Sequence, residues 1–339
     1  VDRAIPTLPR LLQDAGYTTA CFGTWHISAG FWDRGIEEGN QDSHCERAAA
    51  NATRYLHRYL REEPQNRPFF LMVGFDQPHR PFTDTWPDLQ SPDHIAIPAY
   101  LDDVPAVRHE MACFYGGVSR MDAAAGQVLD ALWECGLDEN TLVVFTSDHG
   151  IGMPLAKGTL YDPGLKIPLV MCWNGRVKGG QRCQDLTSNA DLVPTILDAA
   201  GEHSRIPANL DGHSLWPFVE RGENVAHKHI FAEQTWHDFY EPMRAIRTAR
   251  HKLVRNFEPG TGLQIAADIL YSPTVDAMRE TLRNWPRAEI EFYDLDLDPW
   301  ERSNLAGNPN TREIERALTR KLDDWLSRTG DPILKGIVP

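Results

Sequence analysis

The sequence lacks the features of several protein classes. It has no run of about 18 consecutive apolar residues, which excludes a membrane-spanning helix. It also lacks a basic excess: 34 Lys and Arg stand against 48 Asp and Glu, and the net charge of −14 argues against general nucleic-acid binding. Its six cysteines form no Cys-x-x-Cys pair and no zinc-like spacing, so neither a structural zinc site nor a disulfide framework is indicated. An anionic substrate stays compatible with the acidic chain, because a local pocket can oppose the global charge.

The remaining composition is that of a folded protein. Of 339 residues, 42% are hydrophobic and 24% are charged, far from the composition of disordered chains. This length predicts roughly two domains, or one large domain with an appendage. The chain begins with Val1 rather than Met and reaches a helix signal at residues 7–15. We therefore expect these residues to come from the interior of a longer protein.

Strand and helix signals alternate over the first two-thirds of the chain. Helical spacing of apolar residues predicts helices at residues 45–60, 114–132 and 190–200. Short apolar runs predict strands at residues 17–22, 69–75, 141–146 and 167–172. The second of these runs is apolar throughout, as expected for a strand that is buried on both faces. The alternation predicts an α/β fold, with a mainly parallel sheet sandwiched by helices.

The pattern changes at about residue 226. Short alternating runs predict a smaller antiparallel sheet, with strands at residues 229–233, 243–248, 252–256 and 291–295. An amphipathic stretch at residues 311–326 predicts a final helix packed on that sheet. We expect two domains, an α/β domain at residues 1–225 and a smaller α+β domain at residues 226–339.

Polar side chains follow three of the predicted strands where each strand ends. His26 follows the first strand, His79 follows the second, and Asp148 and His149 follow the third, with Lys157 a few residues further on. A single His after a strand is more often structural than catalytic. Because functional groups of open parallel sheets collect at the carboxyl ends of the strands, three such ends predict a shared site. We expect His79 and Lys157 to approach the same pocket as Asp148.

These residue types suit displacement at a sulfuryl or phosphoryl centre. Asp148 and His149 offer a carboxylate and an imidazole to a divalent metal, although an Asp that only caps the following turn is the simpler interpretation. Lys157 and His79 can neutralise a bound oxyanion, and His79 can protonate a leaving oxygen because its reference pKa lies near neutrality. Such chemistry consists mostly of positioning and charge stabilisation.

Six segments of the chain resemble the type I, formylglycine-dependent sulfatases of the alkaline-phosphatase-like superfamily, and they occur in that family's order. They are residues 7–19, Gly23-Thr-Trp-His26, residues 69–81, Val144-Phe-Thr-Ser-Asp-His-Gly150, residues 157–168 and residues 292–305. Together they run over nearly the whole chain. Within the family, residues 241–247 and 271–273 are similar to heparan N-sulfatase (sulfamidase). The resemblance implies hydrolysis of a sulfate ester or N-sulfate of a glycan.

The resemblance also implies roles for individual residues. Asp148 and His149 match the family's metal ligands on this strand, where the second residue is more often Asn. The family metal is usually calcium, but an imidazole ligand leaves manganese or magnesium open. Lys157 matches the sulfate-binding Lys, His79 the acid that protonates the departing group, and His26 the His that steadies the formylglycine. The implied partner is a sulfated sugar or other small sulfate ester, and the implied location is extracytoplasmic.

The chain departs from the family pattern at two places. Thr24 stands where the family has a Lys, which removes one positive contact to sulfate. No Cys or Ser of the chain begins the Cys-x-Pro-x-Arg or Ser-x-Pro-x-Arg segment of the nucleophile, and the paired acidic residues of the family's first strand are missing too. We expect the formylglycine to come from an upstream segment, and the 339 residues alone to be inactive, with a gap in the sheet.

Two other functions fit the same residues. His149 favours a phosphodiesterase or phosphonate monoester hydrolase of the same superfold. Thr24 and the missing nucleophile favour a non-catalytic protein that binds sulfated glycans. For any of these functions, His237 and Arg244 are predicted to bring the smaller domain to the rim of the pocket and to contact the substrate, because Arg pairs bidentately with sulfate or carboxylate. The sequence makes no prediction of an oligomeric state.

Overall fold

The computed structural model describes residues 5–26, 32–62, 67–86, 89–224 and 227–336. The strands β1 (Thr18–Gly23), β2 (Glu38–Asn40) and β3 (Phe69–Gly74) form a parallel sheet in the order β2-β1-β3. The helix α1 (Leu8–Asp14) precedes β1, and Thr7 caps it by accepting a hydrogen bond from the Arg10 N–H. The structure thus agrees with the parallel α/β arrangement predicted from the sequence.

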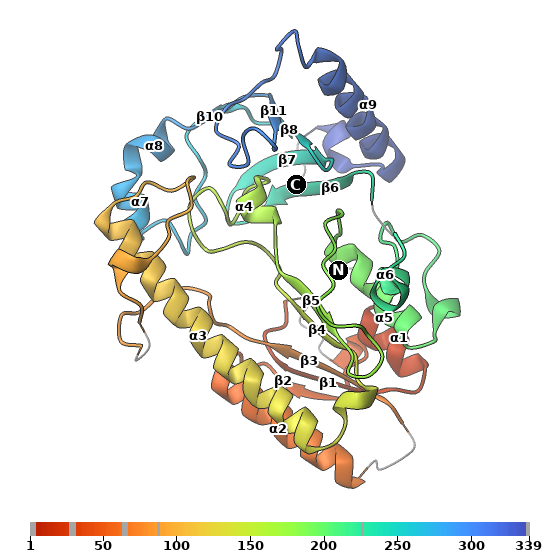
Figure 1. The fold of residues 1–339 in the computed structure, drawn as a ribbon. Coiled ribbons are helices and arrows are strands. Elements are labelled where there is room, and N and C mark those ends of the chain that lie inside the picture. The colour runs from red at the N-terminus through yellow and green to blue at the C-terminus, as the bar shows by residue number, and fades with distance from the viewer. Residues whose placement is uncertain (1–4, 27–31, 63–66, 87–88, 225–226, 337–339) are drawn as a thin grey trace.

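Two long helices, α2 (Cys45–Glu62) and α3 (Pro105–Glu134), lie side by side along this sheet (Figure 1). Ala52 and Leu56 of α2 and Leu132 of α3 are buried together with Ala20 and Phe22 of β1. The apolar spacing that predicted α2 therefore marks the face that this helix buries, whereas the apolar stripe that predicted α3 is buried at Phe114 and Leu132 and partly buried between them.

The second part of the α/β region is built around an antiparallel strand pair. The strands β4 (Val143–Thr146) and β5 (Leu169–Cys172) pair with each other, and a long loop with the short helix α4 (Asp162–Leu165) connects them. The helices α5 (Leu192–Ala199) and α6 (Trp216–Arg221) follow. Short 3-10 helices also occur along the described part of the chain, at Trp32–Arg34, Pro92–His94, Asp138–Asn140, Asn189–Asp191, His203–Arg205 and Pro332–Lys335.

The strand β3 corrects one sequence prediction. Its run Phe69–Gly74 was expected to be buried on both faces, but every residue of it is only partly buried. Among the described residues, β3 pairs with β1 alone and β4 pairs with β5 alone. A cavity of about 2000 Å³ borders both strands, lined by most of β3 and by Val144, Phe145 and Thr146 of β4. Apolar side chains of both strands thus face this cavity.

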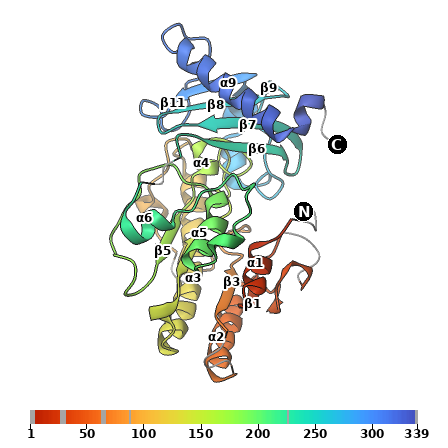
Figure 2. The same ribbon diagram turned by 90° about the vertical axis from the view of Figure 1, so that its right-hand side faces the viewer.

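The C-terminal part forms the predicted antiparallel sheet. The strands β6 (Ile230–Trp236), β7 (Tyr240–Arg247), β8 (His251–Asn256) and β11 (Ile290–Asp294) are arranged in the order β11-β8-β7-β6. The helix α9 (Arg312–Thr329) lies across this sheet (Figure 2). Its Leu318, Leu322 and Leu326, four residues apart, pack on Ile246, Leu253 and Phe292.

The segment between β8 and β11 joins the two parts of the molecule. It contains β9 (Gly260–Thr261), α7 (Pro273–Ala277), α8 (Arg279–Arg283) and β10 (Pro286–Arg287). Buried residues of this segment, among them Ile269 and Met278, share one hydrophobic core with Met111 of α3 and Met153 of the loop before α4. The division at residue 225 stays a prediction, and the core crosses it. None of the helices in the described part of the chain combines the length and the apolarity needed to cross a membrane.

Candidate active site

Five of the seven predicted site residues line the cavity beside β3 and β4. These are His26, His79, Asp148, His149 and Lys157. They come from separate segments, each of which follows β1, β3 or β4. His26 is exposed. Thr24, which the resemblance described above aligns with a Lys, also lines the cavity.

The segment that carries His26 leaves β1 at Gly23, which lies beside Gly74 at the end of β3. Gly23 has a φ of +96°, and a Cβ atom there would lie 1.9 Å from the carbonyl oxygen of Gly74 on the neighbouring strand. Only glycine fits this positive φ and this close approach. The Thr24 N–H then donates to the Gly74 carbonyl, which fixes where the segment to His26 begins.

The loop after β3 holds His79 through its neighbour Arg80. The Arg80 Nε donates to the carbonyl of Gly152, and its guanidinium pairs with Glu110 of α3. Glu110 also accepts the N–H of Thr274 in α7. Both side chains of the Arg80–Glu110 pair are more than nine-tenths buried, so this ion pair fastens the His79 loop to α3, and the hydrogen bond to Gly152 fastens it to the loop before α4. Sequence reasoning assigned neither residue.

Lys157 projects from a buried loop. Met153, Leu155 and Ala156 of this loop lie in the core, and the Lys157 N–H donates to the carbonyl of Ile151. Only 6% of the Lys157 side chain is exposed. Its Nζ lies 3.2 Å from Nε2 of His79, although the two residues are 78 positions apart in the sequence. The structure therefore brings together the two residues that the sequence predicted to meet.

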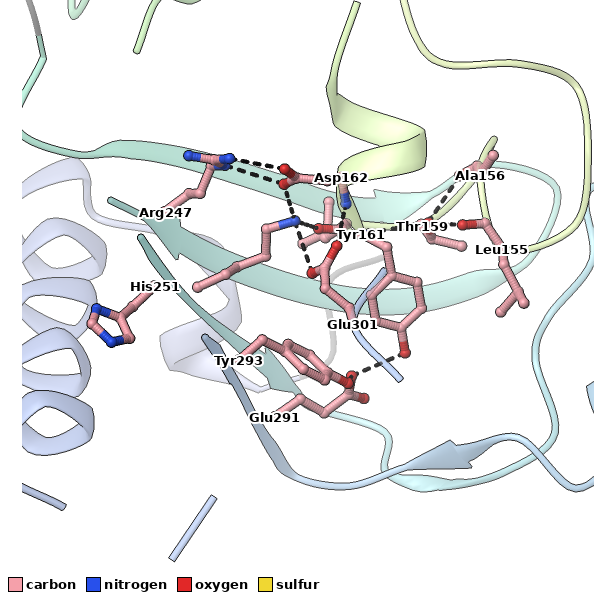
Figure 3. A network of polar contacts seen from close by, with 12 residues as sticks. Leu155, Ala156, Thr159, Tyr161, Asp162, Arg247, His251, Glu291, Tyr293 and Glu301 are labelled. Atoms are coloured by element: carbon pink, nitrogen blue, oxygen red, sulfur yellow. Dashed lines mark hydrogen bonds and ion pairs between the residues drawn. The ribbon is translucent and has the colours of Figure 1, made fainter. Parts of the chain in front are cut away.

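An ionic cluster holds the far end of the Lys157 loop against the C-terminal sheet. Lys252 of β8 is fully buried; its Nζ lies 2.5 Å from an Asp162 carboxylate oxygen and 2.9 Å from one of Glu301. Arg247 of β7 adds a bidentate contact to Asp162, as Figure 3 shows. Burial would raise the pKa of Asp162, but hydrogen bonds and charge from Arg247 and Lys252 lower it to about 2. Asp162 is therefore a carboxylate at neutral pH.

A second polar cluster lies beside the first. The Tyr161 hydroxyl donates to Glu291 of β11 at 2.9 Å and accepts the indole N–H of Trp285, and Figure 3 shows Tyr161 and Tyr293 beside Glu291. Tyr293 donates to the same carboxylate oxygen at 2.7 Å. Burial raises the pKa of Glu291 despite these hydrogen bonds. Four residues after Lys157, the chain is thus fixed by the C-terminal sheet.

Asp148 and His149 have a donor arrangement that fits a divalent metal. The His149 Nδ1 lies 2.7 Å from the carbonyl oxygen of Gly150; it donates to this oxygen, which leaves Nε2 as the available ligand atom. This Nε2 lies 3.7 Å from an Asp148 carboxylate oxygen. Histidines that bind metals commonly donate their other ring nitrogen in this way. The two side chains supply two ligands, and hard cations take about six or more.

Asp268 is a site residue that sequence reasoning missed. It lies in the segment between β9 and α7, and its Oδ2 is 2.7 Å from Nζ of Lys157 and 3.4 Å from Nε2 of His79. Burial would raise the pKa of Asp268, but the hydrogen bond and charge of Lys157 hold it below its ordinary value. The available signal was a lone acidic residue in an otherwise apolar run, residues 265–270.

Two predicted contacts from the smaller domain are not formed. Arg244 is 2% exposed; its Nε and Nη2 donate to the two carboxylate oxygens of Asp331 at 2.6 and 3.0 Å. The prediction that Arg244 binds substrate is therefore wrong, because its guanidinium is used inside the C-terminal part. His237 is partly exposed and pairs with Asp238, but it does not line the cavity. Asp268 is the residue of this part of the chain that contacts Lys157, and Arg247 and Asp296 also line the cavity.

Comparisons with known proteins give two family models and several relatives that match this chain. The family model described as Sulfatase matches residues 1–202, and the model described as N-sulphoglucosamine sulphohydrolase, C-terminal, matches residues 152–265. The chain is 30% identical to human N-sulphoglucosamine sulphohydrolase, over 97% of the chain and 75% of that protein. It is 31% identical to an ulvan-active sulfatase of Formosa agariphila, over 69% of the chain and 41% of that protein.

Solved structures show the same fold. A putative sulfatase from Bacteroides fragilis superimposes with a TM-score of 0.73 at 20% identity, and the match covers all of this chain and 80% of that one. A structure described as BT4656 in complex with its substrate D-glucosamine-2-N,6-O-disulfate matches with a TM-score of 0.69 at 19% identity, over 98% of this chain and 85% of that one. These matches confirm the predicted fold class.

Proposed function

Because the chain belongs to the sulfatase family, we propose that its residues form the sulfate-binding and proton-donating side of a glycan sulfatase active site. The sulfatase relatives confirm the predicted class of enzyme, a sulfuric ester or N-sulfo hydrolase. The chain spans less than two-thirds of several relatives, 41% of one and 62% of another. The activity of a whole protein that contains it is accordingly part of the proposal.

The contact between His79 and Lys157 carries this proposal. The Lys157 ammonium has three donors, so beyond its bond to Asp268 it can donate to an oxygen of a sulfate group in the cavity. His79 keeps Nε2 toward the same place, where it can give a proton to the oxygen or nitrogen that leaves the sulfur. Lys157 projects from a buried loop, and the loop of His79 is anchored by the buried side chain of Arg80, which favours a fixed geometry over a mobile one.

Asp148 and His149 are proposed to hold a divalent metal, with calcium first and manganese or magnesium as alternatives. A metal bound there would supply charge stabilisation to a sulfate oxygen. Further ligands are expected from outside these 339 residues, as is the formylglycine nucleophile, with His26 placed at the cavity to steady it.

The substrate is proposed to be a sulfated sugar, with an N-sulfate of glucosamine as the first choice. The match of residues 152–265 to a family model named for N-sulphoglucosamine sulphohydrolase supports this choice, because those residues include the Lys157 loop, β6 and β7. An O-sulfated glycan is the alternative that the 2-O and 4-O sulfatase relatives support. An extracytoplasmic location fits such a substrate and stays a prediction.

The test measures binding and turnover separately. Binding of inorganic sulfate and of N-sulfoglucosamine to the 339-residue chain is measured by calorimetry with added Ca²⁺ or Mn²⁺. Lys157→Met should weaken sulfate binding roughly tenfold or more, because a charge-assisted contact is lost. Lys178→Met, an exposed lysine that does not line the cavity, is the matched control. Equal affinity in the wild type and in Lys157→Met would rule out the sulfate-binding role.

Turnover is measured in a protein that joins the chain to a segment with a formylglycine nucleophile. An aryl sulfate and N-sulfoglucosamine should be hydrolysed, and His79→Ala should slow the poorer leaving group more, because that group depends more on proton donation. An aryl phosphonate is assayed in parallel, since His149 favours a phosphonate hydrolase. Faster turnover of the phosphonate would replace the sulfatase proposal. Tight sulfate binding without turnover of any ester would favour a glycan-binding protein.

A further inference from the structure

Three potential metal ligands meet at the start of α2. His44, Cys45 and Glu46 each place one ligand atom within 4.8 Å of the other two. In the described part of the chain, no other group of three or more His, Cys, Asp or Glu side chains comes together so closely. None of the three lines the cavity of the candidate active site. We propose that they bind a zinc ion, with a water molecule in the fourth position.

The ligand atoms lie at separations close to those that a tetrahedral zinc ion requires. Zinc bonds of about 2.0–2.3 Å to nitrogen, oxygen and sulfur place neighbouring ligand atoms about 3.3–3.6 Å apart. Oε2 of Glu46 is 3.2 Å from Sγ of Cys45 and 2.6 Å from Nδ1 of His44. The ion would therefore widen only the second separation, by a fraction of an ångström. The His44 side chain is partly exposed and can accommodate this shift.

Nδ1 of His44 lacks the partner that a covered nitrogen needs. The atom is shielded from solvent, and despite its closeness to Glu46 it has no hydrogen-bond partner among the described residues. Covered polar atoms are almost always hydrogen-bonded, and one without a partner is unfavourable. A zinc ion would satisfy this nitrogen, because a neutral imidazole binds zinc through either of its ring nitrogens.

The surroundings hold the carboxylate and the thiol in place. Arg120 of α3 donates through Nε and Nη2 to Oε1 of Glu46, which leaves Oε2 beside the thiol and the imidazole. Cys45 is fully buried, and its N–H donates to Oε1 of Gln77 at 3.0 Å. A cysteine binds zinc as the thiolate, so the metal would replace the thiol proton of Cys45, which is released to solvent.

The proposed site joins three segments of the α/β part. It lies at the first turn of α2, Arg120 brings α3 to it, and Gln77 belongs to the loop after β3. The Asp76 N–H of the same loop donates to the carbonyl of Ser43, one residue before the first ligand. Zinc bound there would have a structural role, because it would fasten these segments together. Cysteine spacing does not reveal such a site, since only one cysteine takes part.

The test measures metal binding to the 339-residue chain with Co²⁺ and Zn²⁺. Co²⁺ occupies zinc sites and gives a sulfur-to-metal charge-transfer band when a thiolate binds it. The wild type should show this band, and Cys45→Ser should lose it. Competition with Zn²⁺ gives the zinc affinity, which His44→Ala should weaken about 100-fold or more, because loss even of an outer-shell partner costs about 10- to 100-fold.

Two controls separate this site from other ligands of the chain. Cys183→Ser removes an exposed cysteine, and Asp148→Asn removes a proposed ligand of the active-site metal. Both should leave the charge-transfer band and the zinc affinity of the thiolate site unchanged. A loss of the band in either control would place the site elsewhere and overturn the inference.

Circular dichroism checks that each variant is folded, and His44→Ala decides the outcome if Cys45→Ser does not fold. A wild type that shows no thiolate band with Co²⁺ would overturn the inference, and this result is expected if His44 and Glu46 form only an ion pair. A band that persists in folded Cys45→Ser, or an unchanged zinc affinity in His44→Ala, would overturn it as well. None of these measurements depends on sulfate binding or turnover.

Discussion

Lys252 of β8, which is fully buried, and Asp162 of α4, whose side chain is 15% exposed, form an ion pair, 2.5 Å between Nζ and Oδ1, that joins the C-terminal sheet to the loop of Lys157. Asp162 follows Lys157 by five residues, and Glu301 shares the same ammonium at 2.9 Å. The smaller sheet, which has no predicted catalytic residue, thereby fixes the position of the loop that carries Lys157. Its contribution to the site through Lys252 is structural, whereas Asp268, from the segment between β9 and α7, contacts Lys157 directly.

Lys252→Met should therefore be strongly destabilising. Removing the ammonium leaves Glu301 and Asp162 buried with less compensation, and breaking a buried ion pair costs about 3–5 kcal/mol. Urea denaturation at pH 7 measures this free energy of unfolding. Arg255→Met is the matched control, because Arg255 lies on the same strand but pairs with the half-exposed Asp323, and a change of about 1 kcal/mol or less is expected. Equal losses in the two variants would contradict the structural role of Lys252.

The stabilisation by Asp162 should depend on pH. Its pKa is lowered to about 2 in the folded protein, against about 3.9 for an unperturbed Asp. A lowered folded-state pKa gives stability that is complete above about pH 5 and is lost as the pH falls from 4 toward 2. Asp162→Asn should cost about 2 kcal/mol at pH 7, and this difference from the wild type should shrink between pH 5 and pH 3. Urea denaturation of both proteins at several pH values measures this difference in the free energy of unfolding. A difference that grows on acidification would contradict a lowered pKa of Asp162 in the folded protein.

The sequence predicted that His79 and Lys157 lie close together, because each follows the end of a predicted strand. The carboxyl ends of parallel strands meet at one edge of a sheet, so side chains that follow them are brought together. Helix α9 was predictable for a similar reason, since Leu318, Leu322 and Leu326 repeat with helical spacing. Asp268 was not predictable in this way. It follows no strand of the parallel sheet, and only the packing of residues 263–285 on α3 brings it to the cavity.

Arg244 and β3 show two other limits of sequence reasoning. An arginine within a predicted strand has the same sequence signature whether it binds a ligand or an internal carboxylate, and Asp331 is 87 residues away. The burial of β3 depends on what covers its second edge, which its own apolar residues do not encode. The apolar run predicted the strand correctly and its burial incorrectly.

Gly150→Ala should disturb the Asp148–His149 pair. A Cβ atom at Gly150 would lie 1.8 Å from the carbonyl oxygen of Pro163, and the Gly150 N–H already donates to Gly164. The two loops must therefore separate, which should cost about 1–3 kcal/mol or more. Mn²⁺ affinity, measured by calorimetry, should fall with it. The control is Gly152→Ala, where the nearest atom lies 3.8 Å away and stability should change little. A Gly150→Ala protein as stable as the control would contradict the close packing of these loops.

Arg244→Ala should act on stability and not on substrate recognition. The guanidinium makes a bidentate contact with Asp331, and both side chains are only 3% exposed. Its Nη1 also donates to the carbonyls of Gln234 and Met243, so truncation removes the counter-charge of a buried carboxylate and one hydrogen-bond donor from each of two carbonyls. A loss of about 3–5 kcal/mol in the free energy of unfolding is expected. His237→Ala is the control: the His237 side chain is 41% exposed, and its removal should change the free energy of unfolding by less than about 0.5 kcal/mol. Sulfate affinity, measured at a temperature where both variants are folded, should match the wild type in both. The opposite outcome is that Arg244→Ala keeps its stability and selectively loses binding of a polyanionic sugar. That result would support a substrate contact by Arg244, which its buried ion pair with Asp331 argues against.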